Sequence, residues 1–218
     1  MRNLDDAELA TLRRQARILI LLDAASKAGL TPMPIIPFHA FAYLSNVLAQ
    51  VWDMPALDGK ILKRKGGPFY PELQHDLDRL VGMGMVLIKQ VSHVRESNGK
   101  WRLEGRYRLN AEMANTPLNF LLGLPDERRF ASFVEELAYA LSALSDQDLE
   151  RALVEDATYS DPSVSVNNVL DFEEWTQRNP SANAANYFDR LMPGCTRATP
   201  GEKLHLYVRH LRRRAHAR

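Results

Sequence analysis

The sequence predicts a mainly α fold in which three helices and a β-hairpin are followed by a second helical region. Apolar residues recur at helical spacing in three segments of the N-terminal part, and a strand-like alternation of apolar and charged residues follows directly. The overall composition, 45% hydrophobic and 25% charged, is that of an ordinary globular protein. We therefore expect a folded chain, whose 218 residues are enough for one or two domains.

Three helices are expected before the hairpin. The first covers residues 5–27 and the second covers residues 38–51. The third opens at Pro71, whose missing N–H removes no helical hydrogen bond in the first turn, and ends at Gly82. Its apolar positions are Leu73, Leu77, Leu80 and Val81. The connection between the second and third helices, residues 54–68, is predicted to be irregular.

The segment after the third helix has the pattern of a two-stranded ribbon. A short apolar run, residues 86–88, is followed by a stretch in which apolar and charged residues alternate from Trp101 to Leu109. Between them, Asn98 and Gly99 form a pair that accepts the positive backbone angles of a tight hairpin turn. Three helices followed by a basic hairpin is the order of a winged helix-turn-helix, which we predict for residues 1–110.

Residues 111–218 are predicted to form a helical docking domain. Helices are expected at residues 126–144 and 145–154, and short elements anchored by aromatic residues are expected within the turn-rich stretch 161–200. A last, basic helix should run from Glu202 to about Arg214.

Charge is divided along the chain although the net charge is only +1. Residues 1–110 hold 16 Lys and Arg against 11 Asp and Glu, residues 111–199 hold 6 against 15, and residues 200–218 hold 6 against 1. A basic module, an acidic one and a basic tail indicate separate surfaces for separate partners, or a contact between the tail and the middle of the chain.

No residue pattern in the sequence indicates an enzyme. The one cysteine, Cys195, lacks a recognisable nucleophile motif and is expected to be inert, and Gly66-Gly67-Pro68 lacks the Lys-Ser/Thr pair of a phosphate loop. We predict no catalytic residue, no metal site and no cofactor. The longest aliphatic run, residues 18–22, is too short to cross a bilayer, and a lone cysteine favours a reducing compartment. The expected location is therefore the cytoplasm, without a membrane partner.

The third helix carries the wrong charges for reading DNA in the major groove. Its expected solvent face consists of Glu72, His75, Asp76, Asp78 and Arg79, with Gln74 beside them. Three carboxylates so close to the phosphates would oppose the attraction that supplies most non-specific DNA binding.

Basic residues of the connection and the hairpin indicate a different route to nucleic acid. The candidates for phosphate contacts are Lys63, Arg64, Lys65, Arg102, Arg106 and Arg108. The alternative is that such a stripe is only the polar face of a half-buried hairpin. The sequence leaves both interpretations open.

One segment resembles a known family. Residues 63–81 read KRKGGPFYPELQHDLDRLV and continue through Gly84 to Val86. This stretch, with Ala42-Tyr43-Leu44-Ser45-Asn46 before it, resembles the third-helix region of the middle-component proteins of bacterial three-component ABC-ATPase defence systems, such as the Lamassu type. The resemblance covers less than half of the chain. It implies a winged-helix accessory subunit that binds an SMC-like ATPase and an effector, and it carries no catalytic residues.

Two functions follow as hypotheses. The first is a non-enzymatic scaffold subunit in anti-phage defence, which bridges an SMC-like ABC ATPase and an effector. Its expected protein interface contains Phe69, Tyr70, Glu72, Asp76 and Arg79, and Trp52 and Trp175 are further aromatic anchors. The alternative for these aromatic residues is that they belong to the core, which is the commoner place for them. The second is a transcriptional regulator that binds duplex DNA through the wing and the basic connection.

Overall fold

The computed structural model describes residues 5–55, 60–64, 67–95, 99, 101–162, 165, 169–171, 179–191 and 197–217. Two compact units are present, each formed from two separate stretches of the chain. Unit 1 contains residues 1–35 and 71–131, and unit 2 contains residues 36–70 and 132–218. The predicted boundary after residue 110 therefore falls inside unit 1, and residues 36–70 group with the C-terminal residues. No helix among the described residues is long and apolar enough to cross a membrane.

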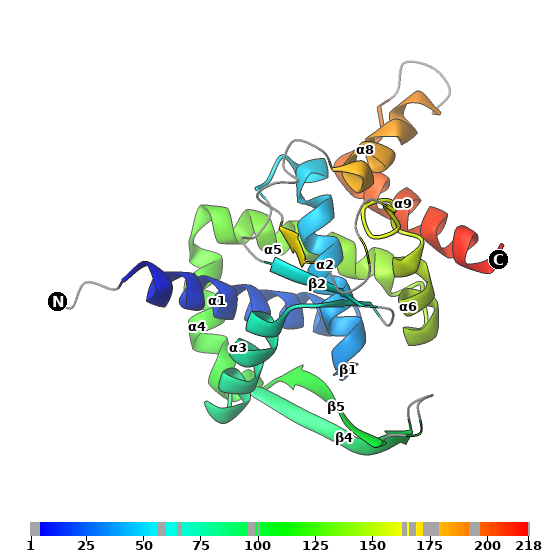
Figure 1. Cartoon of the computed structure of the whole chain (residues 1–218). Coiled ribbons are helices and arrows are strands. Elements are labelled where there is room, and N and C mark those ends of the chain that lie inside the picture. The colour runs from blue at the N-terminus through cyan, green and yellow to red at the C-terminus, as the bar shows by residue number, and fades with distance from the viewer. Residues whose placement is uncertain are drawn as a thin grey trace. The chain divides into compact units, whose positions relative to one another are not determined.

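Unit 1 combines helices with one small sheet (Figure 1). Its elements are α1 (Asp6–Lys27), β1 (Met33–Pro34), α3 (Pro71–Gly82), β4 (Val86–Arg95), β5 (Trp101–Leu109), α4 (Ala111–Gly123) and the beginning of α5 (Pro125–Leu141). At the start of α1, the Asp5 carboxylate accepts a hydrogen bond from the Glu8 amide at 2.7 Å, and the Glu8 carboxylate accepts one from the Asp5 amide. This reciprocal cap satisfies two amides that the helix leaves unpaired and so fixes where α1 begins.

The sheet of unit 1 has the strand order β1-β5-β4, and its strands are antiparallel. Met33 lies opposite Tyr107 and Pro34 opposite Arg106, so the short β1 pairs with the second strand of the hairpin. Within the hairpin the register shifts between Lys89 and Ser92, where Gln90 has a φ of 51°. A bulge of this kind bends one strand and changes which side chains share a face.

Unit 2 is built around a buried helix. Its elements are α2 (Ile35–Leu48), η1 (Ala49–Trp52), β2 (Lys60–Arg64), β3 (Gly67–Phe69), the rest of α5, α6 (Asp146–Val154), β6 (Val169–Asp171), α8 (Pro180–Tyr187), η2 (Phe188–Arg190) and α9 (Pro200–His216). Every residue of α2 from Pro37 to Leu48 is buried. A helix that is apolar on all sides belongs inside a core, because no side of it gains from facing water.

The prediction of a mainly α fold is confirmed, because helices account for most of the described residues. The expected helices at 5–27, 38–51, 71–82, 126–144, 145–154 and 202–214 correspond to α1, α2 with η1, α3, α5, α6 and α9, and the expected hairpin corresponds to β4 and β5. Gly99, in the predicted hairpin turn, has a φ of 82°, and residues 96–98 lie outside the described part of the chain.

Two features of the connections differ from what local sequence signals indicate. The connection 54–68, predicted to be irregular, contains β2 and most of β3, and β2 also pairs with β6, more than 100 residues later. Pro117 does not interrupt the helical structure but lies inside α4, where Ala114 and Leu118 are buried. Their packing offsets the roughly 3 kcal/mol that proline costs in a helix interior.

Candidate interaction surfaces

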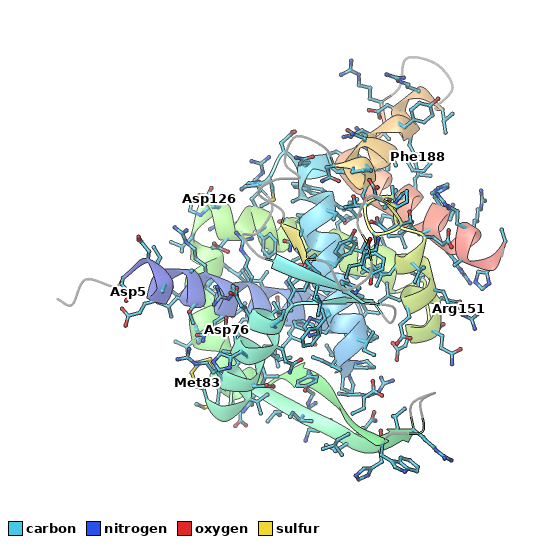
Figure 2. The ribbon with its side chains drawn as sticks, viewed as in Figure 1. Asp5, Asp76, Met83, Asp126, Arg151 and Phe188 are labelled. Carbon is cyan, nitrogen blue, oxygen red and sulfur yellow. The ribbon has the colours of Figure 1, made fainter. Side chains whose placement is uncertain are left out.

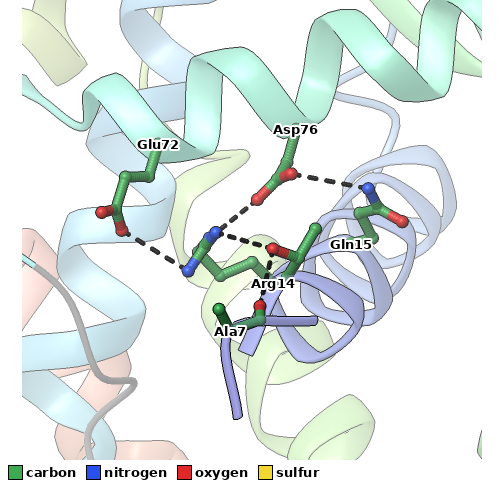
Figure 3. Close-up of polar contacts among 6 residues, drawn as sticks. Ala7, Arg14, Gln15, Glu72 and Asp76 are labelled. Atoms are coloured by element: carbon green, nitrogen blue, oxygen red, sulfur yellow. Dashed lines mark hydrogen bonds and ion pairs between the residues drawn. The ribbon is translucent and has the colours of Figure 1, made fainter. Parts of the chain in front are cut away.

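The third helix of the chain, α3, does not present Asp76 to solvent as the sequence predicted. Asp76 is 1% exposed, and its carboxylate accepts a hydrogen bond from the Nε of Arg14 on α1 at 2.7 Å. Gln15 donates a second hydrogen bond at 3.4 Å. Figure 2 shows Asp76 on α3, and Figure 3 shows Arg14 lying between Asp76 and Glu72. The helix is turned so that Asp76 faces α1, and placing it on the solvent face was an error.

The remaining solvent face of α3 is less acidic than expected. Glu72 is exposed but forms an ion pair with Arg14 at 3.5 Å. Asp78 accepts a hydrogen bond from the amide of Gln74 at 2.9 Å. With His75 and Arg79 also exposed, the face has two carboxylates, one of them already paired, and one arginine. The contrast between this face and a DNA-reading helix is therefore weaker than the sequence indicated.

The predicted phosphate-contacting residues do not form one exposed patch. Lys63 is only 8% exposed, and its ammonium donates to the backbone oxygen of Asp161 at 3.0 Å. Burial lowers the pKa of Lys63, and the nearby Asp161 partly offsets this effect. Lys63 is thus a structural residue of unit 2. Its aliphatic stem is buried, and its charged end reaches the carbonyl oxygen of Asp161.

The other candidates for phosphate contact are on or beside strands. Arg106 is half-buried and donates to the backbone oxygen of Pro32 at 3.0 Å, whereas Arg108 is exposed. Lys65 and the side chains of Arg64 and Arg102 lie outside the described residues. Among the members whose side chains the structure describes, Arg108 is the one that is exposed.

The predicted aromatic anchors belong largely to the core of unit 2. Tyr70 is buried, and its hydroxyl accepts a hydrogen bond from the amide of Asn46 at 3.0 Å. Phe69 is half-buried, with its ring 4.9 Å from the ring of His39. Trp52 is half-buried, with its ring 5.8 Å from that of Phe133. The expectation that Tyr70 is an exposed interface residue was wrong, because α2 supplies its hydrogen-bond partner. Trp175 lies outside the described residues.

The hairpin carries an exposed apolar face that the sequence analysis did not identify. Trp101 is 67% exposed and Leu103 is 62% exposed, and they share a face of β5 because they are two residues apart. On β4, Val91 and Ile88 are also exposed. Gly105 lies on the same face of β5 as Leu103, because the two are two residues apart. A methyl group added at Gly105 would lie within 4 Å of Ile88 and Val91, so these two side chains lie on that face as well. We call Ile88, Val91, Trp101 and Leu103 the hairpin face.

The sequence did not predict the hairpin face, because the alternation of apolar and charged residues does not show whether other residues cover the apolar side of the strand. The same face continues to Tyr107 and Val86 at the base of the hairpin, where both side chains are buried. Figure 1 shows β4 and β5 as a long ribbon leading away from α3. The base of the ribbon is packed within unit 1, and the outer part presents large apolar side chains to solvent. Large exposed apolar groups that lie together mark interaction sites.

Unit 2 contains a buried carboxylate, Asp156, that accepts five hydrogen bonds. Its side chain is fully buried. Two hydroxyls donate at short range, from Tyr43 at 2.6 Å and from Tyr207 at 2.7 Å. The hydroxyl of Ser181 donates at 2.9 Å, and the amides of Thr158 and Tyr159 donate at 3.1 and 3.0 Å. These donors come from α2, α8, α9 and the turn after α6, so one side chain holds four segments together.

Buried tyrosines of unit 2 make its stability sensitive to alkaline pH. Burial raises the pKa of Tyr43 and Tyr70 well above the usual value, and the negative charge of Asp156 adds to the effect on Tyr43. Burial also raises the pKa of Tyr207, again with a contribution from Asp156. A raised pKa in the folded state means that stability is full below the unfolded pKa of about 10 and falls as the pH rises above it.

We expect the free energy of unfolding to fall by about 1 kcal/mol for each of these tyrosines between about pH 10 and pH 11. Urea unfolding followed by circular dichroism at both pH values measures this fall. Tyr43→Phe should make the fall smaller by about 1 kcal/mol, and Tyr139→Phe, which changes a more exposed ring, should leave it unchanged. An equal fall in wild type and Tyr43→Phe would contradict the expectation.

The described residues contain no group of three or more His, Cys, Asp and Glu side chains placed to hold a metal ion. His205 contacts Glu136 at 3.1 Å and His216 contacts Asp148 at 3.2 Å, both on the surface of unit 2. Cys195 lies outside the described residues. Comparisons with protein-family models, with curated proteins and with solved structures found no match.

Proposed function

We propose that this chain is a non-enzymatic accessory subunit that binds a protein partner through the hairpin face. The observation that carries the proposal is the exposure of Trp101 and Leu103 together with Ile88 and Val91. Leaving these side chains in water forgoes about 25 cal/mol for each Å² of apolar surface that a partner could cover. Tryptophan is also among the residue types most enriched at the centres of protein interfaces.

We further propose that the N-terminal part of the chain is a winged helix-turn-helix. Its support is the element order α1, β1, α2, α3, β4, β5, together with the pairing of β1 with β5. In this interpretation β4 and β5 are the wing. The insertion of β2 and β3 between α2 and α3 is an addition to that plan.

The partner that fits this proposal best is an SMC-like ABC ATPase with an effector, in bacterial anti-phage defence. Its support is the resemblance of residues 63–81 to the middle components of such systems. The exposed apolar residues of the hairpin favour a protein partner over a DNA groove. The subunit would bridge the ATPase and the effector in the cytoplasm.

The test is copurification of the full chain with the products of its neighbouring genes. Trp101→Ser combined with Leu103→Ser is expected to weaken partner binding at least about 30-fold, which corresponds to the roughly 2 kcal/mol of an interface hot spot. The matched control is Phe120→Ser with Met113→Ser, which removes two apolar side chains that are also exposed, on α4. The control should bind like wild type, and both variants should keep the wild-type melting temperature.

Two results would count against the proposal. If the wild-type chain elutes alone as a monomer when its neighbours are present, the accessory role is lost. If the Trp101 and Leu103 variant binds as tightly as the control, the partner does not use the hairpin face.

The second candidate function is a regulator that binds duplex DNA through the wing. It is favoured by Arg108 and Lys89, which are both exposed on the hairpin. The register places both on the opposite side of the ribbon from the hairpin face, because Arg108 pairs with Leu87 and Lys89 with Arg106. Salt-dependent binding to a specific duplex that is abolished by reversing the charges of Arg102, Arg106 and Arg108 would favour this function over the first.

A further inference from the structure

The outer side of α9 carries a row of positive charge. Arg209, Arg212, Arg213 and His216 are all exposed, and their spacing of three and four residues puts them on one side of the helix. Together with Ala217 they line a shallow hollow at the C-terminal end of α9. We call Arg209, Arg212 and Arg213 the α9 arginine row.

Lys203 and Arg214 of α9 have acidic partners, whereas the arginine row forms no ion pair with any residue that the structure describes. Lys203 pairs with Asp189 at 2.8 Å, and Arg214 pairs with Glu155 at 3.3 Å. His216 contacts Asp148 at 3.2 Å. Among the described residues, no carboxylate lies within ion-pairing distance of the row.

Asp148 interacts with Arg212 of the row through charge, without forming an ion pair with it. Its pKa is lowered chiefly by a hydrogen bond from Ser145, and His216 and then Arg212 contribute through their positive charges. One carboxylate that already contacts His216 cannot neutralise three arginines, so the row keeps an excess of positive charge.

One arginine of the row, Arg213, also acts on a neighbouring histidine. The pKa of His210 is lowered, first by partial burial and then by the positive charges of Arg214 and Arg213. Residues 111–199 contain many acidic residues, yet those that the structure describes form no ion pair with the row. Three adjacent guanidinium groups repel one another, and a polyanion would relieve that repulsion.

The surroundings of the row favour phosphates over the other polyanions. The apolar side of α9, which consists of Leu204, Tyr207, Val208 and Leu211, is buried within unit 2, so the helix has no free apolar side to insert into a lipid surface. The exposed side of α9 itself carries no Trp, Tyr or Phe to anchor a protein interface. Arginine suits phosphate well because its planar fork can donate two hydrogen bonds to one phosphate group.

The length of the row also fits a nucleic-acid duplex. From Arg209 to His216 the helix rises about 10 Å. A DNA duplex carries about six negative charges over that length, counted on both strands. We propose that the α9 arginine row binds the phosphate backbone of a nucleic-acid duplex without reading its sequence. This site shares no residue with the hairpin face, so the proposal does not depend on the proposed protein partner.

The test measures binding of the full chain to a fluorescein-labelled DNA duplex of about 30 bp, by fluorescence anisotropy between about 50 and 200 mM salt. Each phosphate contact contributes about 0.9 to the slope of log affinity against log salt. The variant Arg209→Gln, Arg212→Gln, Arg213→Gln should therefore have a slope smaller by about 2.7. Over this fourfold salt range, the wild-type affinity should fall about 40-fold more than that of the variant.

The matched control removes the same charge from three scattered places. Arg13, Arg129 and Arg151 are exposed on α1, α5 and α6, and each is replaced by Gln (Arg151 is labelled in Figure 2). The control should change the slope by less than about one. Equal slopes for the two triple variants, or no duplex binding by wild type, would overturn the proposal. So would a polyglutamate peptide that binds as tightly as the duplex and loses binding in the same variant, because the row would then be a site for acidic proteins.

Discussion

Replacing Asp156 by alanine is expected to lower the free energy of unfolding by about 4 kcal/mol or more. The change leaves the hydroxyls of Tyr43 and Tyr207 and the amide of Tyr159 buried without their acceptor. The Ser181 hydroxyl and the Thr158 amide also lose their hydrogen bonds to Asp156, but each keeps another partner. Each unsatisfied buried donor costs about 1–3 kcal/mol, although Ser181 and Thr158 keep a hydrogen bond with each other. Because whole domains are stable by only about 5–15 kcal/mol, this loss is a large fraction of the stability of unit 2 and should lower its unfolding midpoint markedly.

Urea unfolding followed by circular dichroism measures the fall in the free energy of unfolding. If Asp156→Ala does not fold, two further variants test the same prediction. Tyr207→Phe removes one of the five hydrogen bonds to Asp156 and also the one that the Ala157 amide donates to the same hydroxyl, so it should cost about 2 kcal/mol. Asp156→Asn keeps one acceptor oxygen and should fall between Tyr207→Phe and Asp156→Ala. The control Glu112→Gln changes an exposed carboxylate on α4 and should leave stability within about 0.5 kcal/mol of wild type. A loss below about 1 kcal/mol for Asp156→Ala would mean that the buried cluster does not hold unit 2 together.

The elements that the sequence predicted well are those whose signals are local. Pro71 and Gly82 mark both ends of α3, and the alternation from Trp101 to Leu109 marks β5. Each of these signals lies within the element that it specifies, so no knowledge of distant residues was needed. The predictions that were wrong depend on partners far away in the sequence. Asp76 meets Arg14 at a separation of 62 residues, and Lys63 meets Asp161 at a separation of 98.

The interaction surfaces were harder to predict for the same reason. Trp101 and Leu103 alternate with charged residues, as apolar residues do on a strand that packs against a core. Only the length of the hairpin decides that Tyr107 is buried while Trp101 is exposed. Likewise, the sequence places several arginines in α9, but it does not say that Glu155 pairs with Arg214 and leaves the others open. A charge becomes a candidate binding group only when its neighbours are known.

Replacing Arg14 by methionine is expected to cost about 3–5 kcal/mol in unit 1. Arg14 is the cationic partner of Asp76, which is almost completely buried. After the change, Gln15 is the remaining donor to that carboxylate among the described residues. An uncompensated buried charge is among the most destabilising consequences of a single substitution. Glu72 is exposed and would lose its ion pair at little cost, because surface ion pairs contribute only about 0–1 kcal/mol.

A double-mutant cycle separates this explanation from a simple loss of packing. Asp76→Leu in the Arg14→Met background replaces the ion pair by two apolar side chains and should restore most of the lost stability, since buried ion pairs exchanged as a whole for apolar residues are often neutral. Thermal and urea unfolding of the four proteins give the coupling between the two positions. The control Arg13→Met changes an exposed arginine on the same helix and should cost less than about 0.5 kcal/mol. If the double variant is less stable than Arg14→Met, the cost arises from packing between α1 and α3, and the buried charge of Asp76 is not its cause.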